Sequence, residues 1–316
     1  MSHQHEKRGN SKAGGHHLRL QDRVALIVGA GRGIGEAIAL RFAAEGARLI
    51  LAARTAGELE TVARKIRAAS GTALIATTDV TAPEQVASLV QKSIETFGQI
   101  DILVNAAGTY GPIGRAWEVD AQEWANTFSV NLFGPFLVCQ SVLPHMIRAG
   151  RGKIINFSGG GATSPLCRFS AYGVSKAAVV RFTETLADEL KEFNIQVNAI
   201  APGAVDTKLQ DSVLAAGEKA GDLLQRIRRL RETGEGGTPP EVPAELAVFL
   251  ASGDSGHLSG RLISAPNDKW ESWTDERLAE IMSKPWFTLR RLDPFTLLPL
   301  LEEMRAEAAT AQANSR

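Results

Sequence analysis

The chain has 316 residues, of which 44% are hydrophobic, and its 35 basic residues balance its 35 acidic ones. This length and composition fit one large α/β domain with extensions. The absence of net charge gives no general attraction to nucleic acid or to an anionic membrane, so we expect a small-molecule partner, no nucleic acid and no membrane.

The ends and the cysteines indicate the compartment. No apolar run approaches the roughly 20 residues that span a bilayer, and the polar N-terminus lacks the hydrophobic core of a signal peptide. Cys139 and Cys167 lie in different predicted elements and indicate no disulfide framework. We therefore predict a cytoplasmic protein. Residues 1–19 lack periodicity, so we expect a disordered leader in which metal binding by histidines would be adventitious, at His3, His5, His16 and His17.

Folded structure is predicted to begin at Arg23, where the short buried strand VALIVG runs into a glycine-rich turn and a helix. The turn reads Gly29-x-x-x-Gly33-x-Gly35, which differs from the common G-x-G-x-x-G spacing and is weak evidence alone. Glycines here let the backbone turn tightly and approach a pyrophosphate, while the next helix offers its N-terminal amides. The pattern predicts a phosphate-binding βα turn.

The second predicted strand, ARLILAA, ends at Arg54. A carboxylate about 20 residues past the glycines accepts from the ribose hydroxyls of NAD, whereas an arginine there accommodates the 2′-phosphate of NADP. No acidic residue follows this strand before Glu58, and Arg32 in the glycine turn supplies a second cation. The two arginines favour NADP, with NAD as the less favoured alternative.

Strands and helices then alternate. Helices are predicted over residues 58–69 and 83–97, with a third strand that ends at Asp79 and Val80 and a fourth strand, DILVNAAG. This alternation predicts a doubly wound parallel sheet of about seven strands with helices on both faces and the site at the carboxyl ends of the strands. Asp79, Asn105 and Gly108 fall at such ends.

A long helical region from about residue 117 to 147 contains Asn131 among apolar neighbours. A buried amide needs hydrogen-bond partners. Asn131 is therefore either a structural hydrogen-bond hub or part of the site.

The fifth strand, KIINFS, enters a glycine run at residues 159–161 and then a helix with Tyr172 and Lys176 four residues apart, on one face. A nearby ammonium favours the phenolate and brings the pKa of Tyr172 towards the range of acid/base catalysis. Tyr and Lys also meet at this spacing by chance, so the pair depends on its context.

A sixth strand, NIQVNAIAPG, ends at Pro202 and Gly203. The charged helical segment 208–233 follows, and its place beside the strand ends predicts a lid over a substrate. A helix over residues 242–251 and a last strand, GRLISA, complete the predicted sheet.

Together these motifs resemble the short-chain dehydrogenase/reductase family, in its compact single-domain branch, from about residue 20 to 265. The resemblance implies a Rossmann-type NAD(P)-binding oxidoreductase domain over residues 20–266, a small carbonyl or alcohol substrate, and a homodimer or homotetramer. It implies that Tyr172 exchanges a proton with the substrate oxygen, that Lys176 holds the nicotinamide ribose and lowers the phenol pKa, and that Asn131 anchors a water in the proton relay. With the two arginines, the expected cofactor contacts are Gly29, Arg32, Gly33, Ile34, Gly35, Arg54, Asp79, Val80, Asn105, Ala106, Gly108, Tyr172, Lys176, Pro202, Gly203, Val205 and Thr207.

The chain departs from the family at the position thirteen residues before the tyrosine. The family usually has a serine there that hydrogen-bonds the reacting carbonyl, and this chain has Gly159, one residue after Ser158. Neighbouring strand residues point to opposite faces, so Ser158 substitutes only if the backbone shifts or bulges. Other candidates are the amides of residues 159–161 and Ser164.

A second departure is the C-terminal extension, residues 267–316, which follows the last strand where the family commonly ends. We expect it to be partly ordered, with its aromatic residues packed or reaching a neighbouring subunit and the residues after Glu302 frayed. The aromatic residues are Trp270, Trp273, Trp286, Phe287 and Phe295.

The leading hypothesis is an NADP-linked oxidoreductase that interconverts a secondary alcohol and a ketone. Its substrate class stays open, with a 3-oxoacyl thioester among the alternatives. The competing class is a cofactor-binding sensor or scaffold with weak or lost turnover, which Gly159 keeps open.

Overall fold

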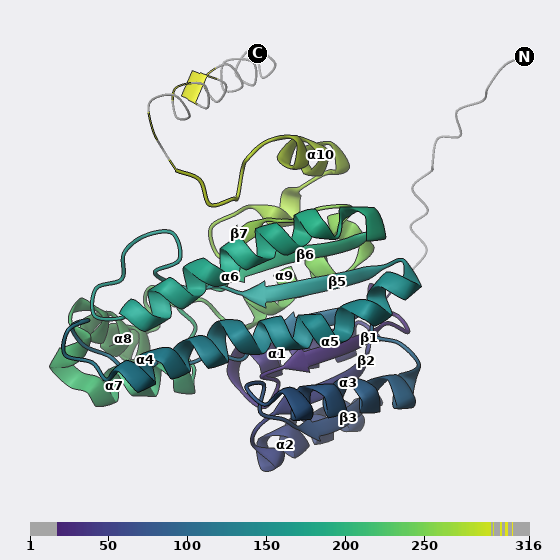
Figure 1. The fold of residues 1–316 in the computed structure, drawn as a ribbon, viewed down its shortest axis with the longest axis horizontal. Helices are drawn as coiled ribbons and strands as arrows, with labels where there is room; N and C mark the ends of the chain where they lie inside the picture. The colour runs from purple at the N-terminus through teal and green to yellow at the C-terminus, as the bar shows by residue number, and fades with distance from the viewer. Residues whose placement is uncertain (1–17, 292, 294–297, 299–300, 303–304, 306–316) are drawn as a thin grey trace, which may run out of the picture.

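The computed structural model describes residues 18–291, 293, 298, 301–302 and 305, and Figure 1 shows their arrangement. The four histidines of the predicted leader, Phe295 and most residues after Glu302 lie outside the described residues. Arg19, the last residue of that leader, donates to Glu45 over 2.8 Å and also to Glu245. Contacts with the folded domain are therefore in place at Arg19.

Seven parallel strands form one sheet in the order β3-β2-β1-β4-β5-β6-β7. The sheet and its helices on both faces confirm the predicted fold class. The order reverses between β1 and β4, which places a crevice at the carboxyl ends of these two strands. The strands are β1 Val24–Val28, β2 Arg48–Ala53, β3 Thr72–Thr77, β4 Ile102–Asn105, β5 Gly152–Phe157, β6 Ile195–Ala201 and β7 Leu262–Ser264.

The central strands are buried on both sides because helices cover both faces, and all five residues of β1 are buried. One apolar core lies between the sheet and α1, α2 and α9, and the other lies under α3, α5 and α6. Figure 1 shows α5 and α6 crossing one face of the sheet. The helices of these two layers are α1 Gly33–Ala44, α2 Ala56–Ala68, α3 Pro83–Phe97, α5 Gly134–Ala149, α6 Ser170–Glu189 and α9 Glu241–Ala251.

Several predicted boundaries change in the structure. β3 ends at Thr77, so Asp79 and Val80 lie in the following loop, where the Asp79 carboxylate accepts from the Thr81 amide over 2.9 Å. The helical region predicted from residue 117 comprises α4 Ala121–Phe128, the π-helical segment η1 Ser129–Phe133 and α5. The N-terminal side of α4 is fixed by Asp120, whose carboxylate caps the helix.

One continuous helical stretch, Ala121–Ala149, is long and apolar enough to cross a membrane by length and composition. It differs in this respect from the expectation of no such apolar run. In the fold, 44% of its most apolar window is buried, and α5 supplies side chains to the core beneath the sheet. Core helices pass the same length test, so the stretch is weak evidence for a membrane span.

The segment 208–233 folds into short helical turns and two helices, α7 Asp211–Ala216 and α8 Asp222–Thr233. The apolar side of α8 packs with Val213 of α7 onto Tyr110, Phe169 and Tyr172. The predicted lid therefore lies against the Tyr172 helix, and Figure 1 shows α7 and α8 together at the end of the molecule where α6 begins.

The C-terminal extension returns to the open edge of the sheet. Two outward amides of β7 are occupied, because Leu262 N donates to Phe287 O over 2.8 Å and Ser264 N donates to the Asp268 carboxylate over 2.7 Å. Trp270 is only 3% exposed, and its ring lies tilted against that of Phe249 in α9, with the ring centroids 5.7 Å apart. The extension, with α10 Asp275–Ser283, thus covers an edge strand that would otherwise offer free hydrogen-bonding groups.

Candidate active site

A pocket of about 830 Å3 opens at the carboxyl ends of the strands, where the strand order predicts a ligand site. It brings together residues from position 28 to position 288 of the sequence. Of the predicted site residues, those that line it are Gly29, Arg32, Gly33, Ile34, Gly35, Arg54, Asp79, Val80, Ala106, Gly108, Ser158, Tyr172, Lys176, Pro202, Gly203, Val205 and Thr207. Asn105 and Asn131 do not line it.

The glycine turn forms a cradle that side chains would fill. Gly29 has a φ of 81°, and a Cβ added there would stand 2.6 Å from Ala107 N. A Cβ on Gly35 would stand 2.1 Å from Gly29 O, so α1 begins directly on the turn. The tightly packed backbone of this turn leaves no room for side chains and leads into the N-terminal amides of α1. This arrangement fits the pyrophosphate of a dinucleotide.

The end of the pocket with Arg32 and Arg54, where the sequence predicts the adenosine of the cofactor, also carries a carboxylate. Arg54 makes no hydrogen bond or ion pair with the described residues, whereas Arg32 Nη1 donates to Glu58 Oε1 over 3.2 Å. Hydrogen bonds from the amide and hydroxyl of Thr81 hold the pKa of Asp79 below its usual value, with a smaller effect from Arg54. A carboxylate, Glu58, therefore lies beside one of the two predicted cations, Arg32.

Tyr172 and Lys176 face the other end of the pocket from the first two turns of α6. Burial raises the pKa of Tyr172 above the ordinary phenol value, and the nearby Tyr110 adds to the rise. Burial lowers the pKa of Lys176 to about 8, and its Nζ donates to Phe157 O over 2.8 Å. The sequence predicts that Lys176 lowers the pKa of Tyr172, but in the structure without cofactor this pKa is raised. Desolvation outweighs the effect of the Lys176 ammonium, which lies 5.7 Å from the centre of the phenol ring.

Asn131 is a hydrogen-bond hub in η1. Its Oδ1 accepts from Thr109 N over 2.8 Å, and its Nδ2 donates to Thr109 O and to Ser175 Oγ, each over 2.9 Å. A Cβ on Gly108 would lie 3.4 Å from Asn131 Oδ1 and 3.5 Å from Lys176 Nζ. Asn131 therefore joins the loop after β4 to the helix of Tyr172, directly behind the pocket wall.

Asn105 lies inside the sheet rather than on the pocket surface. Its Nδ2 donates to Asn156 Oδ1 over 2.9 Å on the neighbouring strand, and Asn156 donates onward to Thr183 of α6 over 2.9 Å. The structure thus gives Asn105 a positioning role between β4, β5 and α6.

The glycine run explains how the site closes without the usual serine. A Cβ on Gly159 would stand 2.1 Å from the Tyr172 hydroxyl oxygen, so the phenol occupies the space of a side chain. Gly161 has a φ of 90° and packs against Gly173 of α6, where a Cβ would lie 2.7 Å from the Gly173 Cα. The Ser158 hydroxyl is buried, borders the pocket and has no hydrogen-bond partner among the described residues.

Two groups in the pocket were missed by sequence reasoning. The Tyr110 ring lies 4.6 Å from the Tyr172 ring, and its hydroxyl donates to Gln210 Oε1 of the lid over 3.1 Å. Thr288 and Phe287 of the C-terminal extension border the same pocket. Proximity to the N-A-A-G strand end was a signal for Tyr110, whereas nothing local in the sequence points to residue 288.

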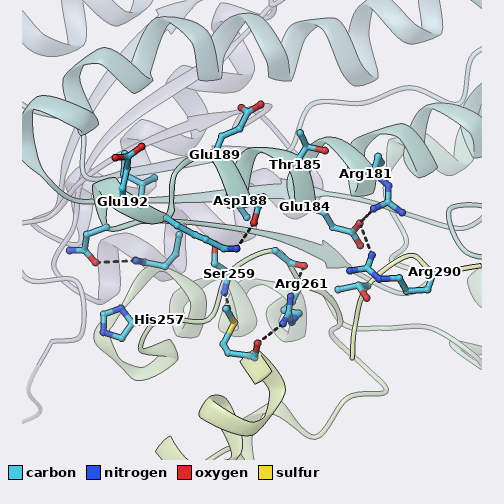
Figure 2. Close-up of a pocket in the computed structure, with 18 residues that line it drawn as sticks. Arg181, Glu184, Thr185, Asp188, Glu189, Glu192, His257, Ser259, Arg261 and Arg290 are labelled. Atoms are coloured by element: carbon cyan, nitrogen blue, oxygen red, sulfur yellow. Dashed lines mark hydrogen bonds and ion pairs between the residues drawn. The ribbon is translucent and has the colours of Figure 1, made fainter. Parts of the chain in front are cut away.

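A second cavity, of about 970 Å3, lies between α6 and the C-terminal extension. Figure 2 shows Arg181 and Arg290 on either side of the Glu184 carboxylate, and Arg261 among backbone carbonyls. None of the predicted site residues borders it. The smaller pocket therefore carries the candidate chemistry.

In the described part of the chain, no group of three or more His, Cys, Asp or Glu side chains is arranged to hold a metal ion.

The chain matches the family model described as short chain dehydrogenase over residues 23–217. It is 38% identical to the short-chain reductase protein NovJ of Streptomyces niveus over 247 residues, which are 77% of this chain and 92% of the relative. It is 35% identical to the 3-oxoacyl-acyl-carrier-protein reductase FabG of Thermotoga maritima over 247 residues, 78% of this chain and 97% of the relative.

Solved structures with both cofactors share the fold. A 7α-hydroxysteroid dehydrogenase complexed with NADH and 7-oxo glycochenodeoxycholic acid matches with a TM-score of 0.70 and 31% identity, covering 78% of this chain and 94% of that one. An actinorhodin polyketide ketoreductase with NADPH matches with a TM-score of 0.72 and 30% identity, covering 77% and 95%.

Proposed function

The chain belongs to the short-chain dehydrogenase/reductase family of NAD(P)-dependent oxidoreductases, and we propose that it uses NADP to interconvert a secondary alcohol and a ketone. The observation that carries this proposal is one continuous pocket with the glycine turn at one end and Tyr172 with Lys176 at the other. When bound, the nicotinamide supplies the hydride donor or acceptor.

The chain's own residues have separate tasks in this proposal. Tyr172 exchanges the proton of the substrate oxygen, and its phenol is the proton donor in the reductive direction. Lys176 lies one helical turn away and holds the cofactor ribose. Asn131, already bonded to Thr109 and Ser175, anchors the water of the proton relay.

Ser158 is our candidate for the group that polarises the substrate carbonyl. A buried hydroxyl without a partner is uncommon, because the desolvated polar atom is not compensated. Ser158 is 3% exposed and lines the same pocket as Tyr172. A carbonyl oxygen in this space would supply the missing hydrogen bond.

The preference for NADP is supported by Arg32 and Arg54 at the adenosine end. Relatives with this fold are known with NADH and with NADPH, so the similarity does not distinguish the two cofactors. The preference must therefore be measured on this protein. We expect NADPH to bind more tightly than NADH in fluorescence titrations and Arg54→Ala to remove most of the difference. Equal affinities, or unchanged discrimination in the variant, would contradict the preference.

Turnover is tested by NADPH oxidation against a panel of small ketones, aromatic ketones and 3-oxoacyl thioesters. Tyr172→Phe should lower kcat by about 10²- to 10⁴-fold while cofactor affinity stays nearly unchanged, because only the transferable proton is lost. Lys176→Ala should impair both turnover and cofactor binding. A Phe variant with a near-wild-type rate would show that another acid acts.

Two alternatives remain within this test. Reduction of 3-oxoacyl thioesters alone would favour that substrate class, which the similarity to FabG supports. Cofactor binding with no turnover of any carbonyl would favour the sensor or scaffold, which the absence of a hydroxyl at Gly159 supports.

We also propose a homodimer or homotetramer, a cytoplasmic location, and a division into leader 1–19, oxidoreductase domain 20–266 and extension 267–316. A stacked aromatic pair on α5 and η1, Phe136 and Phe133, is 38% and 45% exposed and supports association of subunits. Sedimentation velocity tests the oligomeric state.

A further inference from the structure

One carboxylate oxygen at the adenosine end of the pocket joins three separate segments. Glu58 Oε1, in the first turn of α2, lies 3.2 Å from Arg32 Nη1, just before α1, and 3.2 Å from Lys208 Nζ, the first residue of the lid. The partners are 26 and 150 residues away in sequence. The cluster therefore exists only because the fold brings the glycine turn, α2 and the lid together.

Glu58 is the inner member of this cluster. Its side chain is 24% exposed, whereas those of Arg32 and Lys208 are 54% and 63% exposed. It lies directly on the glycine turn, since a Cβ on Gly31 would be 3.1 Å from Glu58 Cβ and 3.3 Å from its Oε2. The carboxylate thus occupies space beside the turn on which a dinucleotide rests.

The two arginines proposed to bind the 2′-phosphate are consequently not equivalent. Arg54 has no hydrogen bond or ion pair with the described residues, whereas Arg32 is held by Glu58. A phosphate monoester carries about −1.5 to −2 charges, so it is attracted by Arg32 and repelled by Glu58. The ribose hydroxyls of NAD carry no charge and can donate to a carboxylate.

We infer that Glu58 is a specificity-determining residue, an internal counter-anion that holds Arg32 and weakens the binding of NADP relative to NAD. This inference rests on the proposed function, because it concerns the cofactor of the same site. Lys208 and Arg32 neutralise part of the Glu58 charge, and the 2′-phosphate must compete with Glu58 for Arg32. The preference for NADP is accordingly smaller than two free arginines would give.

The test uses direct binding of cofactor fragments, so it needs no turnover. Adenosine 2′,5′-bisphosphate and 5′-AMP differ by the 2′-phosphate, and their affinities for the full chain are measured by calorimetry. Glu58→Gln keeps the shape of the side chain and removes its charge. The matched control is Glu60→Gln on the same helix, because Glu60 pairs with Arg67 over 3.1 Å and does not border the pocket.

We expect Glu58→Gln to bind the bisphosphate about threefold to tenfold more tightly and 5′-AMP no more tightly, with Glu60→Gln unchanged. The gain should shrink as salt is raised, because it is electrostatic. Unchanged bisphosphate binding, or equal tightening of both ligands, would overturn the inference. Weaker bisphosphate binding would also overturn it, because Glu58 would then be needed to orient Arg32.

The outcomes separate this inference from the proposed cofactor. If the wild-type chain favours the bisphosphate and Glu58→Gln does not increase that preference, the inference fails and the NADP proposal stands. If the wild-type chain binds both fragments equally and Glu58→Gln creates a preference, the NADP proposal fails and the inference stands. Circular dichroism confirms that each variant is folded.

Discussion

At the scale of single residues, the most informative position is Gly159, where the phenol oxygen of Tyr172 occupies the space of the family's serine side chain. The φ of Gly159 is not in the left-handed region, so a substitution meets no backbone strain. It meets the phenol instead, since the new Cβ would stand 2.1 Å from the Tyr172 oxygen. Both Gly159→Ser and Gly159→Ala are therefore expected to displace Tyr172 and lower kcat/KM.

Comparing the Ser and Ala variants separates the steric effect of a side chain at position 159 from the effect of its hydroxyl group. If a hydroxyl at this position helped the reaction, the Ser variant would be faster than the Ala variant by up to about 10²- to 10³-fold, the range for one oxyanion donor. A Ser variant faster than the wild type would contradict the steric prediction.

Ser158→Ala tests whether the Ser158 hydroxyl polarises the substrate carbonyl. The hydroxyl makes no hydrogen bond with the described residues, so its removal should not lower the free energy of unfolding, because an uncompensated buried polar atom is lost. The kcat should nevertheless fall if the hydroxyl polarises the carbonyl. Undiminished kcat would remove Ser158 from the candidate site.

Lys176 gives a prediction about pH. Its folded pKa of about 8 is below the ordinary 10.5, so the unfolded state binds more protons between these values and stability rises with pH across this window. Below pH 8 the full cost of burying the charged amine remains. Urea unfolding at pH 7, 8, 9 and 10 should show that Lys176→Met gains stability relative to the wild type at pH 7 and that the gain shrinks towards pH 10.

Lys153 is the matched control, because burial lowers its pKa to about 8 as well, at the opposite end of β5. Lys153→Met should reproduce the pH dependence of stability without a loss of cofactor binding. A gain in Lys176→Met that stays constant with pH would show that the lysine is not titrating in this window.

At the scale of elements, a hydrogen bond joins the lid to the loop after β4 within an apolar interface. Tyr110 donates to Gln210, and Gln210 Nε2 donates to Val205 O over 3.3 Å. Around this contact lie the apolar side chains of α7 and α8. This hydrogen bond therefore orients the lid, while the buried apolar side chains of α7 and α8 provide most of the stabilisation of the interface.

Tyr110→Phe removes this hydrogen bond and keeps the ring against Tyr172. We expect KM to rise about threefold to tenfold, in line with the loss of roughly 1 kcal/mol for one neutral hydrogen bond, while kcat changes less. Limited proteolysis should cleave the 208–233 segment faster in the variant. Equal proteolysis rates and kinetics would show that Tyr110 does not hold the lid.

At the scale of the whole molecule, the C-terminal extension completes the fold. It supplies hydrogen-bond partners to β7 and buries Trp270 against α9. The described aromatic residues of the extension pack at the sheet edge, and Phe295 lies outside the described residues. The same segment borders the candidate active site through Phe287 and Thr288.

Truncation after Ala265 should lower the thermal midpoint and change the sedimentation behaviour, because it opens the β7 edge and exposes the core under α9. Trp270→Ala is a milder variant that should cost about 3–5 kcal/mol of unfolding free energy, as for other large aromatic side chains in cores. A truncated chain with unchanged midpoint and sedimentation would show that the extension contributes nothing to the fold.

The alternation of strands and helices, the glycine turn and the pair of Tyr172 and Lys176 on one helix face could be predicted from the sequence. These features depend on periodicity, chain reversal and side-chain direction within one or two turns, so neighbouring residues encode them. The predicted end of the third strand differs from the structure because Asp79 accepts a loop hydrogen bond from the Thr81 amide after β3.

The set of groups that share the pocket could not be predicted from the sequence, because it depends on contacts between distant segments. Glu58 meets Lys208 across 150 residues, and Tyr110 meets Gln210 across 100. The occupation of the Gly159 side-chain space by the Tyr172 phenol, and the resulting desolvation of that phenol, follow from how α6 packs on β5. Such contacts depend on the packing of whole elements, and no local pattern in the sequence records that packing.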